Sequence, residues 1–158
     1  MFLWFASLNK NFVGKLDVHF FAVAAADCLS DPIMDIARCR TVDDLTKIKG
    51  LASPLPVQFD FNERPDGTAI AITGFPLLNS LPVTSRGYIA AYQVGTSGPS
   101  VMVLDRAAWP GGSGSPVYDS HGRVLGMLIQ AGEGTASGIS YARSGFTIKQ
   151  FLAAHPVQ

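Results

Sequence analysis

One serine in the sequence, Ser113, is surrounded by glycines in the segment WPGGSGSPVYDSHGRVLGMLI, residues 109–129. Glycines around a serine allow a tight turn whose backbone N–H groups point outward. Acyl transfer needs an exposed hydroxyl beside such donors, which stabilise the oxyanion of the intermediate. The segment predicts Ser113 as a nucleophile with an oxyanion hole built from Gly111, Gly112 and Ser113, in which the amides of Gly111 and Ser113 donate. The letters GGSGS taken alone are more typical of a loop that only connects two strands.

The elements that must position this serine are predicted to be short strands. Runs of β-branched and aromatic residues alternate with glycine and proline, which favours an all-β sandwich or barrel. The runs are NFVGKL (11–16), VHFFAVAAA (18–26), TAIAITGF (68–75), GYIAAYQV (87–94), SVMVLD (100–105), SPVYD (115–119), RVLGMLIQA (123–131) and GISYAR (138–143). YDSHGRV predicts a hairpin with Gly122 in the turn. The sequence predicts a single helix, over GFTIKQFLAAH (145–155).

Composition limits the class of protein. The 158 residues are 47% hydrophobic and 15% charged, with twelve basic and twelve acidic side chains. This composition indicates a folded chain, without the basic surface that nucleic acid or an anionic membrane would need. No apolar run approaches the ~20 residues of a membrane span. The polar stretch FNERPDG (61–67) divides the chain into predicted halves, residues 1–62 and 63–158.

The two cysteines and the apolar start say little about compartment. Cys28 and Cys39 lack the spacing of a zinc site, and no metal or other cofactor is expected. We predict two buried free thiols, with one disulfide as the alternative. The start MFLWFASLNKNF has no basic lead-in and no small-residue cleavage site, so a signal peptide is not expected. The prediction is a soluble chain whose compartment and oligomeric state stay open.

The segment around Ser113 resembles the nucleophile region of the trypsin-like (chymotrypsin-fold) serine peptidases, especially bacterial members of the HtrA and glutamyl-endopeptidase types. Three further segments resemble that family in the same order: GTAIAITGFPL (67–77), LPVTSRGYIAAY (81–92) and GISYAR (138–143). The resemblance covers residues 67–152 well and the first half loosely. It implies a chymotrypsin-like double β-barrel with a C-terminal helix.

The resemblance also implies a histidine at the end of an apolar strand, as the general base of the triad. The stretch of that form here is AVAAADCLSD, which puts Asp27 at the histidine's position. None of His19, His121 and His155 falls at the position of the base. The segment after Asp27 is shorter than in the family, which implies a shortened first barrel.

Two aspartates compete for the orienting position of the triad. Asp44 begins DLTKIK and Asp35 begins DIARCR, and both resemble the family's Asp-Ile/Leu-Ala motif. Asp44 is favoured because LASPLPVQF behind it resembles the linker that follows the motif. The catalytic set implied by the resemblance is therefore Ser113, Asp44 and Asp27.

The same resemblance places the substrate pocket. Its base is expected near Ala107, and its walls at Ile129, Gln130, Ala131 and Gly138. None of these side chains is charged, which favours a small or apolar residue in the substrate. Residues 129–131 could also pair with an extended peptide as an added strand.

Three functional hypotheses follow. An aspartate is a poor general base for a serine hydroxyl near neutral pH. The first hypothesis is a serine endopeptidase that is impaired by Asp27. The second is a catalytically inactive pseudoprotease that binds peptides or proteins in its cleft. The third is a degenerate domain with no activity.

Overall fold

The computed structural model describes residues 2–10, 16–49, 57–78, 81–93 and 99–156. The chain divides into two compact units. One unit comprises Met1–Ser30 and Ala37–Pro56, and the other comprises Asp31–Ile36 and Val57–Gln158. The first carries Asp27 and Asp44, and the second carries Ser113.

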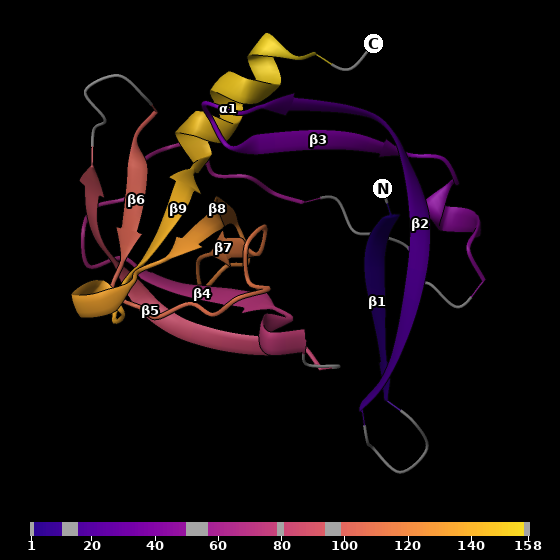
Figure 1. Cartoon of the computed structure of the whole chain (residues 1–158), viewed down its shortest axis with the longest axis horizontal. Helices are drawn as coiled ribbons and strands as arrows, with labels where there is room; N and C mark the ends of the chain where they lie inside the picture. The colour runs from indigo at the N-terminus through magenta and orange to yellow at the C-terminus, as the bar shows by residue number, and fades with distance from the viewer. Residues whose placement is uncertain (1, 11–15, 50–56, 79–80, 94–98, 157–158) are drawn as a thin grey trace. The chain divides into compact units, whose positions relative to one another are not determined.

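The second unit is built on a closed barrel with the strand order β4-β5-β6-β9-β8-β7 (Figure 1). Its strands are β4 (Ala69–Gly74), β5 (Val83–Gln93), β6 (Val101–Leu104), β7 (Pro116–Tyr118), β8 (Val124–Ala131) and β9 (Ser140–Ser144). Alternation along the strands fills the barrel: in β4, Ile70 and Ile72 are buried while their neighbours are more exposed. The core consists of Ile70, Ile72, Ile89, Met102, Leu104, Val117, Leu125, Leu128 and Ala142.

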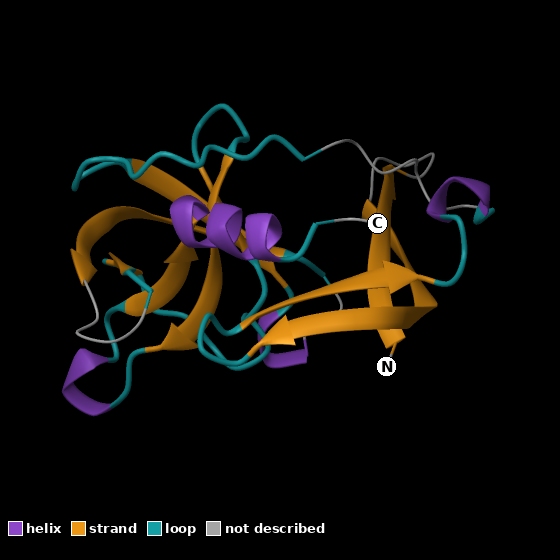
Figure 2. Cartoon of the chain, turned by 90° about the horizontal axis from the view of Figure 1, so that it is seen from above, coloured by secondary structure: helices purple, strands orange, loops and turns teal. Residues whose placement is uncertain are grey.

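Helix α1 (Gly145–Ala154) follows β9 directly and packs on the outside of the barrel (Figure 2). The Ser144 hydroxyl caps it by accepting a hydrogen bond from the Thr147 amide. Ile148 and Phe151 are buried with Ile36, in a second apolar cluster that Met34, Phe61, Met127 and Leu152 surround. The segment Asp31–Ile36 is therefore part of the packing around the helix.

The first unit contains a three-stranded sheet in the order β1-β2-β3. Strand β1 (Phe2–Lys10) pairs antiparallel with β2 (Leu16–Asp31), and β3 (Ile36–Thr41) lies on the other side of β2. The short 3₁₀ helix η1 (Leu45–Lys47) follows. The predicted strand 18–26 lies within β2, whereas the predicted strand 11–16 falls mostly outside the described residues. Strands β1 and β3 were not predicted.

The fold class is confirmed: the chain is mostly β, with a closed six-stranded barrel and a C-terminal helix among its described elements. The predicted hairpin is also present, because β7 and β8 flank a turn in which Gly122 has φ +78°. Where a shortened first barrel was predicted, the described residues form the three-stranded sheet β1-β2-β3. Short 3₁₀ helices add to the one predicted helix: η1, η2 (Pro76–Leu78) and η3 (Gly134–Ala136).

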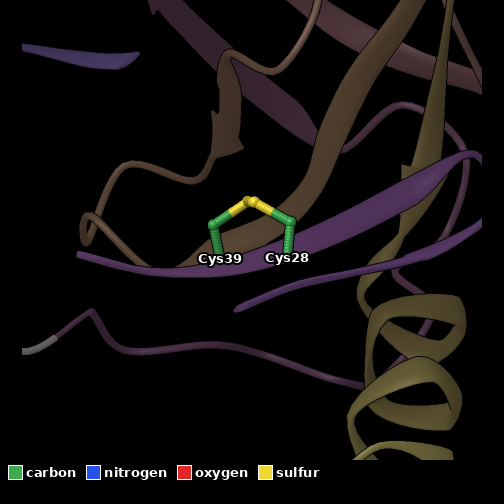
Figure 3. Close-up of a disulfide and its surroundings, with 2 residues drawn as sticks. All are labelled: Cys28 and Cys39. Atoms are coloured by element: carbon green, nitrogen blue, oxygen red, sulfur yellow. A yellow bond between two sulfur atoms is a disulfide. The ribbon is translucent and has the colours of Figure 1, made fainter. Parts of the chain in front are cut away.

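The prediction of two buried free thiols is wrong, because Cys28 and Cys39 form a disulfide (Figure 3). Cys28 lies in β2 and Cys39 in β3, and the two strands are neighbours in the sheet. Strand pairing brings their Cα atoms to 4.0 Å. Cys28 is exposed and Cys39 is half-buried. The sequence reading missed the bond because it had no strand over residues 36–41.

Candidate active site

The loop from β6 to β7 holds Ser113 against β8. The Gly114 amide donates to the Leu128 carbonyl at 2.8 Å, and the Leu128 amide donates to the Ser115 carbonyl at 2.9 Å. Gly111 and Gly114 both have φ +86°, the left-handed region that favours glycine. Gly111 and Gly114 thus adopt the backbone conformation that a tight turn around the serine requires.

Ser113 is exposed, so its hydroxyl is accessible to solvent, as its predicted role as a nucleophile requires. Its Oγ donates to the backbone carbonyl of Ile129 at 3.1 Å. Ile129 is on β8, so the hydroxyl stands beside the strand that was predicted to hold an extended peptide. The contact is with a carbonyl, which cannot take the proton of the hydroxyl as a general base would.

The backbone amides near Ser113 differ in what they contact. The Gly112 amide donates to the Trp109 carbonyl at 3.0 Å and is used within the turn. The amides of Gly111 and Ser113 have no acceptor among the described residues. These two are the amides that the sequence predicted as oxyanion donors, and an oxyanion hole needs N–H groups that are free to receive a ligand.

A small cavity lies beside the glycine-rich loop around Ser113 and includes Ala107. It is lined by Ile72, Gly74, Pro76, Val83, Ser85, Ala107, Ala108, Trp109, Gly112, Ser115 and Leu128. The other predicted pocket residues do not line it. Ile129, Gln130 and Ala131 lie on β8, and the exposed Gly138 lies just before β9. The substrate pocket formed by these residues stays a prediction.

Asp27 lies in β2 and contacts an arginine that the sequence reading did not consider. Its Oδ2 accepts a hydrogen bond from Arg40 Nη2 of β3 at 2.5 Å, and both side chains are largely exposed. Asp27 also has φ +48°, which is uncommon for a residue other than glycine. A predicted disulfide would have indicated this pair. If Cys28 lies opposite Cys39 on antiparallel strands, residue 27 lies opposite residue 40.

Asp44 caps η1. Its Oδ1 accepts hydrogen bonds from the Thr46 amide at 3.0 Å and from the Thr46 hydroxyl at 2.6 Å. The hydrogen bond from the Thr46 hydroxyl, with those from the Thr46 amide and Lys47, lowers the pKa of Asp44. The carboxylate that the sequence favoured as the orienting acid thus has a local structural role.

The competing residue, Asp35, belongs to the same unit as Ser113. It precedes β3 in an exposed turn with φ +52°, beside the buried Ile36. The turn is held by Asp31, whose Oδ1 accepts hydrogen bonds from the amides of Ile33 and Met34. The choice between Asp44 and Asp35 stays open.

The three histidines lie in different elements. His121 is exposed in the β7–β8 turn. This turn follows β7, whereas Ser113 precedes it. His155 follows α1, and its ring lies against Phe151 with 4.8 Å between ring centroids. His19 lies in β2 with Ser7 as its cross-strand partner.

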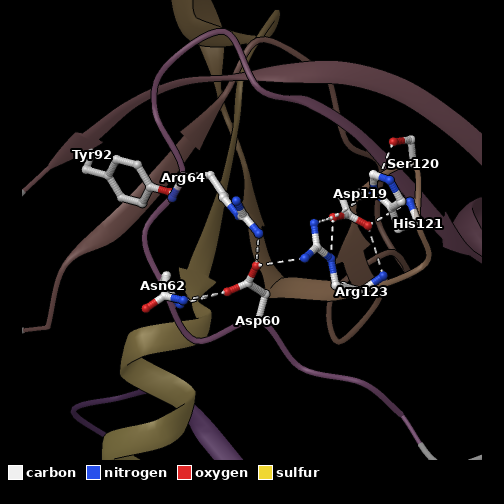
Figure 4. A network of polar contacts seen from close by, with 8 residues as sticks. All are labelled: Asp60, Asn62, Arg64, Tyr92, Asp119, Ser120, His121 and Arg123. Carbon is white, nitrogen blue, oxygen red and sulfur yellow. Dashed lines mark hydrogen bonds and ion pairs between the residues drawn. The ribbon is translucent and has the colours of Figure 1, made fainter.

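A network of charged side chains surrounds two buried carboxylates, those of Asp60 and of Asp119, which follows β7 (Figure 4). Arg123 donates through Nε to Asp119 Oδ2 at 2.8 Å and reaches Asp60 Oδ2 with Nη1 at 3.8 Å. Asp60 also binds Arg64, whose amide donates to the Tyr92 hydroxyl. Asp60 and Asp119 are 7% and 8% exposed, so these contacts must offset a real desolvation cost. The sequence reading missed this network.

The network predicts a stability change in acid. Burial alone would raise the pKa of Asp119, but hydrogen bonds from the Arg123 side chain and from the amides of Arg123 and His121 lower it to about 2. A carboxyl with a lowered folded pKa contributes stability above its unfolded pKa, and this stability is lost as the pH falls through the folded pKa. The melting temperature of Asp119→Asn should therefore lie below that of the native chain at pH 5, and the gap should close between pH 3.8 and about 2.

Melting curves of both chains across that pH range give the measurement. Asp66→Asn changes an exposed carboxylate in the same unit and serves as the control. A gap between native and Asp119→Asn that stays constant down to pH 2 would contradict the assigned cause.

The fold and the serine loop together define the class. A closed antiparallel barrel with a C-terminal helix presents an exposed serine within a glycine-rich loop, as chymotrypsin-like peptidases do. The sequence matches the family described as trypsin-like peptidase domain over residues 17–127. The chain belongs to this family.

Solved structures show the same fold. The active form of the Rv3671c protease from M. tuberculosis superposes with a TM-score of 0.71 at 19% identity, covering 92% of this chain and 66% of that one. The HtrA-type protease AlgW, solved with a decapeptide, gives 0.65 at 19% identity over 94% of this chain and 44% of its own. The MamO protease domain from Magnetospirillum magneticum gives 0.59 at 15% identity, covering 97% and 75%. The chain thus spans about two thirds of the first of these proteins and less than half of AlgW.

No curated protein sequence matches the chain. Among the described residues, no helix has the length and apolar character that a membrane crossing needs.

Proposed function

We propose that the chain is a serine endopeptidase domain that hydrolyses peptide bonds through an acyl-enzyme on Ser113. The observation that carries the proposal is the nucleophile loop: an exposed hydroxyl stands beside two backbone amides, of Gly111 and Ser113, without acceptors among the described residues. Attack of Oγ on a carbonyl carbon would place the developing oxyanion where such donors stabilise it. Membership in the trypsin-like family supports the reaction class.

The proposed activity is impaired because Asp27 takes the position of the general base. Ser113 must lose its proton as it attacks, and a histidine ring both takes this proton and later gives it to the leaving amine. A carboxylate is a weaker base for a serine hydroxyl. The contact of Asp27 with Arg40 further occupies this carboxylate. Loss of one triad member leaves roughly 10³–10⁴-fold catalysis over water in serine proteases.

The orienting acid of the proposal is Asp44 or Asp35. Asp44 already accepts hydrogen bonds from Thr46 within η1, whereas the structure assigns Asp35 no such capping role. Substituting each by asparagine in the Asp27→His background separates them. The substitution that removes the rescued activity identifies the acid.

The substrate of the proposal is a peptide or protein with a small or apolar residue before the scissile bond. The proposed pocket has Ala107 at its base and Ile129, Gln130, Ala131 and Gly138 in its walls, none of them charged. Residues 129–131 of β8 would pair with the peptide backbone. AlgW, which shares the fold, was solved with a decapeptide.

The alternative is a pseudoprotease that binds a peptide without cleaving it. The observation that favours it is the ion pair of Asp27 with Arg40, because an aspartate held in this way is a poor replacement for a mobile base. The strand β8 and the free amides near Ser113 would still receive a peptide.

A fluorophosphonate probe, which labels activated serines, separates the two functions. The proposed enzyme is labelled slowly, the labelling disappears in Ser113→Ala, and it rises several orders of magnitude in Asp27→His. Ser120→Ala, which changes an exposed serine of the β7–β8 turn, controls for probe attached elsewhere. Labelling only after Asp27→His supports the pseudoprotease. Labelling in none of the forms contradicts both, since the site would not be assembled.

A further inference from the structure

The turn that precedes β5 is hydrogen-bonded to the nucleophile loop at the peptide bond that carries the proposed oxyanion donor. The Leu77 amide donates to the Pro110 carbonyl at 2.8 Å. The Pro110 carbonyl and the Gly111 N–H belong to one peptide unit, and no described peptide bond is cis. Because a trans peptide is planar, its C=O and N–H point in opposite directions. Holding the carbonyl on the Leu77 side therefore turns the Gly111 N–H to the other side.

Leu77 has a backbone conformation that leucine rarely adopts. Its φ and ψ are +56° and +33°, within the left-handed region. Its side chain is 60% exposed, so packing of the side chain does not explain the conformation. Strain of this kind persists where the surrounding structure imposes it, and it gathers at functional sites.

The turn and the loop also fit closely in space. A Cβ added to Gly111 would lie 3.2 Å from the Phe75 carbonyl oxygen and 3.5 Å from the Leu77 nitrogen. The turn therefore lies close against Gly111, and a reversal of the Pro110–Gly111 peptide would break the hydrogen bond from Leu77. Within the loop itself, the Gly112 amide donates a hydrogen bond to the Trp109 carbonyl.

We propose that Leu77 is a positioning residue for the oxyanion hole: its left-handed backbone and its amide fix the Pro110–Gly111 peptide with the Gly111 N–H toward the substrate. The proposal rests on the proposed function for its catalytic meaning. The hydrogen bond itself can be tested whether or not Ser113 reacts.

Two substitutions at residue 77 separate backbone from side chain. Leu77→Val keeps the amide but puts a β-branched residue in the left-handed region, which disfavours the turn. Leu77→Gly also keeps the amide and tolerates that region. Leu81→Val is the matched control, because Leu81 is 50% exposed in the same connection and its φ is not positive.

The first measurement is the rate of fluorophosphonate labelling of Ser113, recorded with the melting temperature of each variant. We expect Leu77→Val to lower the rate about ten-fold or more, toward the 10²–10³-fold loss of a missing oxyanion donor, with little change in melting temperature. Leu77→Gly should recover most of this loss, and Leu81→Val should match the native chain. Equal rates for Leu77→Val and Leu81→Val would overturn the proposal.

The second measurement keeps the proposal testable if the native chain is not labelled. Amide hydrogen exchange by NMR should show protection at residue 77 in the native chain, and at least about ten-fold faster exchange in Leu77→Val with a shifted Gly111 resonance. An unshifted Gly111 resonance in Leu77→Val, or an unprotected amide at residue 77 in the native chain, would overturn the positioning role. Absence of labelling in every variant, Asp27→His included, would instead count against the proposed function.

Discussion

Gly111→Ala should lower the rate of Ser113 labelling by about 10²–10³-fold, the loss typical of one missing oxyanion donor. Gly111 has φ +86°, and an added Cβ would lie 3.2 Å from the Phe75 carbonyl oxygen. Alanine therefore meets both backbone strain and a close backbone neighbour, and the Gly111 N–H would turn away from the oxyanion. The measurement is the second-order rate constant for the fluorophosphonate, taken in the Asp27→His background so that the loss can be measured.

Gly114 provides the matched control for this substitution. It has the same φ of +86°, but an added Cβ there would have no described atom within 4 Å. Gly114→Ala has a similar backbone cost of about 1–2 kcal/mol without an obstructing neighbour. If both variants lose the same labelling rate, general strain in the loop explains the loss, and the special role of the Gly111 amide is contradicted.

Phe151→Ala should lower the free energy of unfolding by about 3–5 kcal/mol, the cost typical of removing a large buried aromatic ring. Phe151 is 1% exposed and lies in a cluster with Ile148 of the same helix and with Ile36. Its loss leaves a cavity between the helix and the segment that precedes β3. Urea unfolding followed by circular dichroism gives the measurement.

Phe146 makes a close comparison, because it belongs to the same helix and is 46% exposed. Phe146→Ala should change the free energy of unfolding by less than about 1 kcal/mol. Similar losses in the two variants would show that α1 is not anchored mainly through Phe151. The alternative would then be that residues on several faces of the helix contribute.

Much of the barrel could be predicted because its signals are local. The alternation in AIAITG, the turn around Gly122 and the helical spacing after residue 145 each predict one element without reference to the others. Strand β3, with the sequence IARCRT, carries two arginines and a cysteine and lacks a clear apolar alternation. It becomes a strand through pairing with β2, which a local reading does not see.

In the candidate site too, local signals could be predicted and contacts between distant residues could not. The glycines around Ser113 are contiguous in the sequence, and they predicted a loop whose exposed serine and left-handed glycines the structure contains. The grouping of Ser113 with Asp27 and Asp44 stays a prediction, as do the pocket walls. Two of the contacts that were missed join residues far apart along the chain: Asp60 with Arg123, and Leu77 with Pro110. Such pairs depend on the tertiary fold, and no spacing rule reveals them.

The bond between Cys28 and Cys39 has a practical consequence for every assay of Asp27. It links the two strands at the residues next to Asp27 and Arg40, so it holds the hydrogen-bonded partners in register. A purification in dithiothreitol, or expression in a reducing cytosol, would remove this link and leave strand pairing and the Asp27–Arg40 contact to hold the register. Labelling experiments should therefore be run on oxidised protein whose thiol content has been checked, with reduced protein as a separate sample.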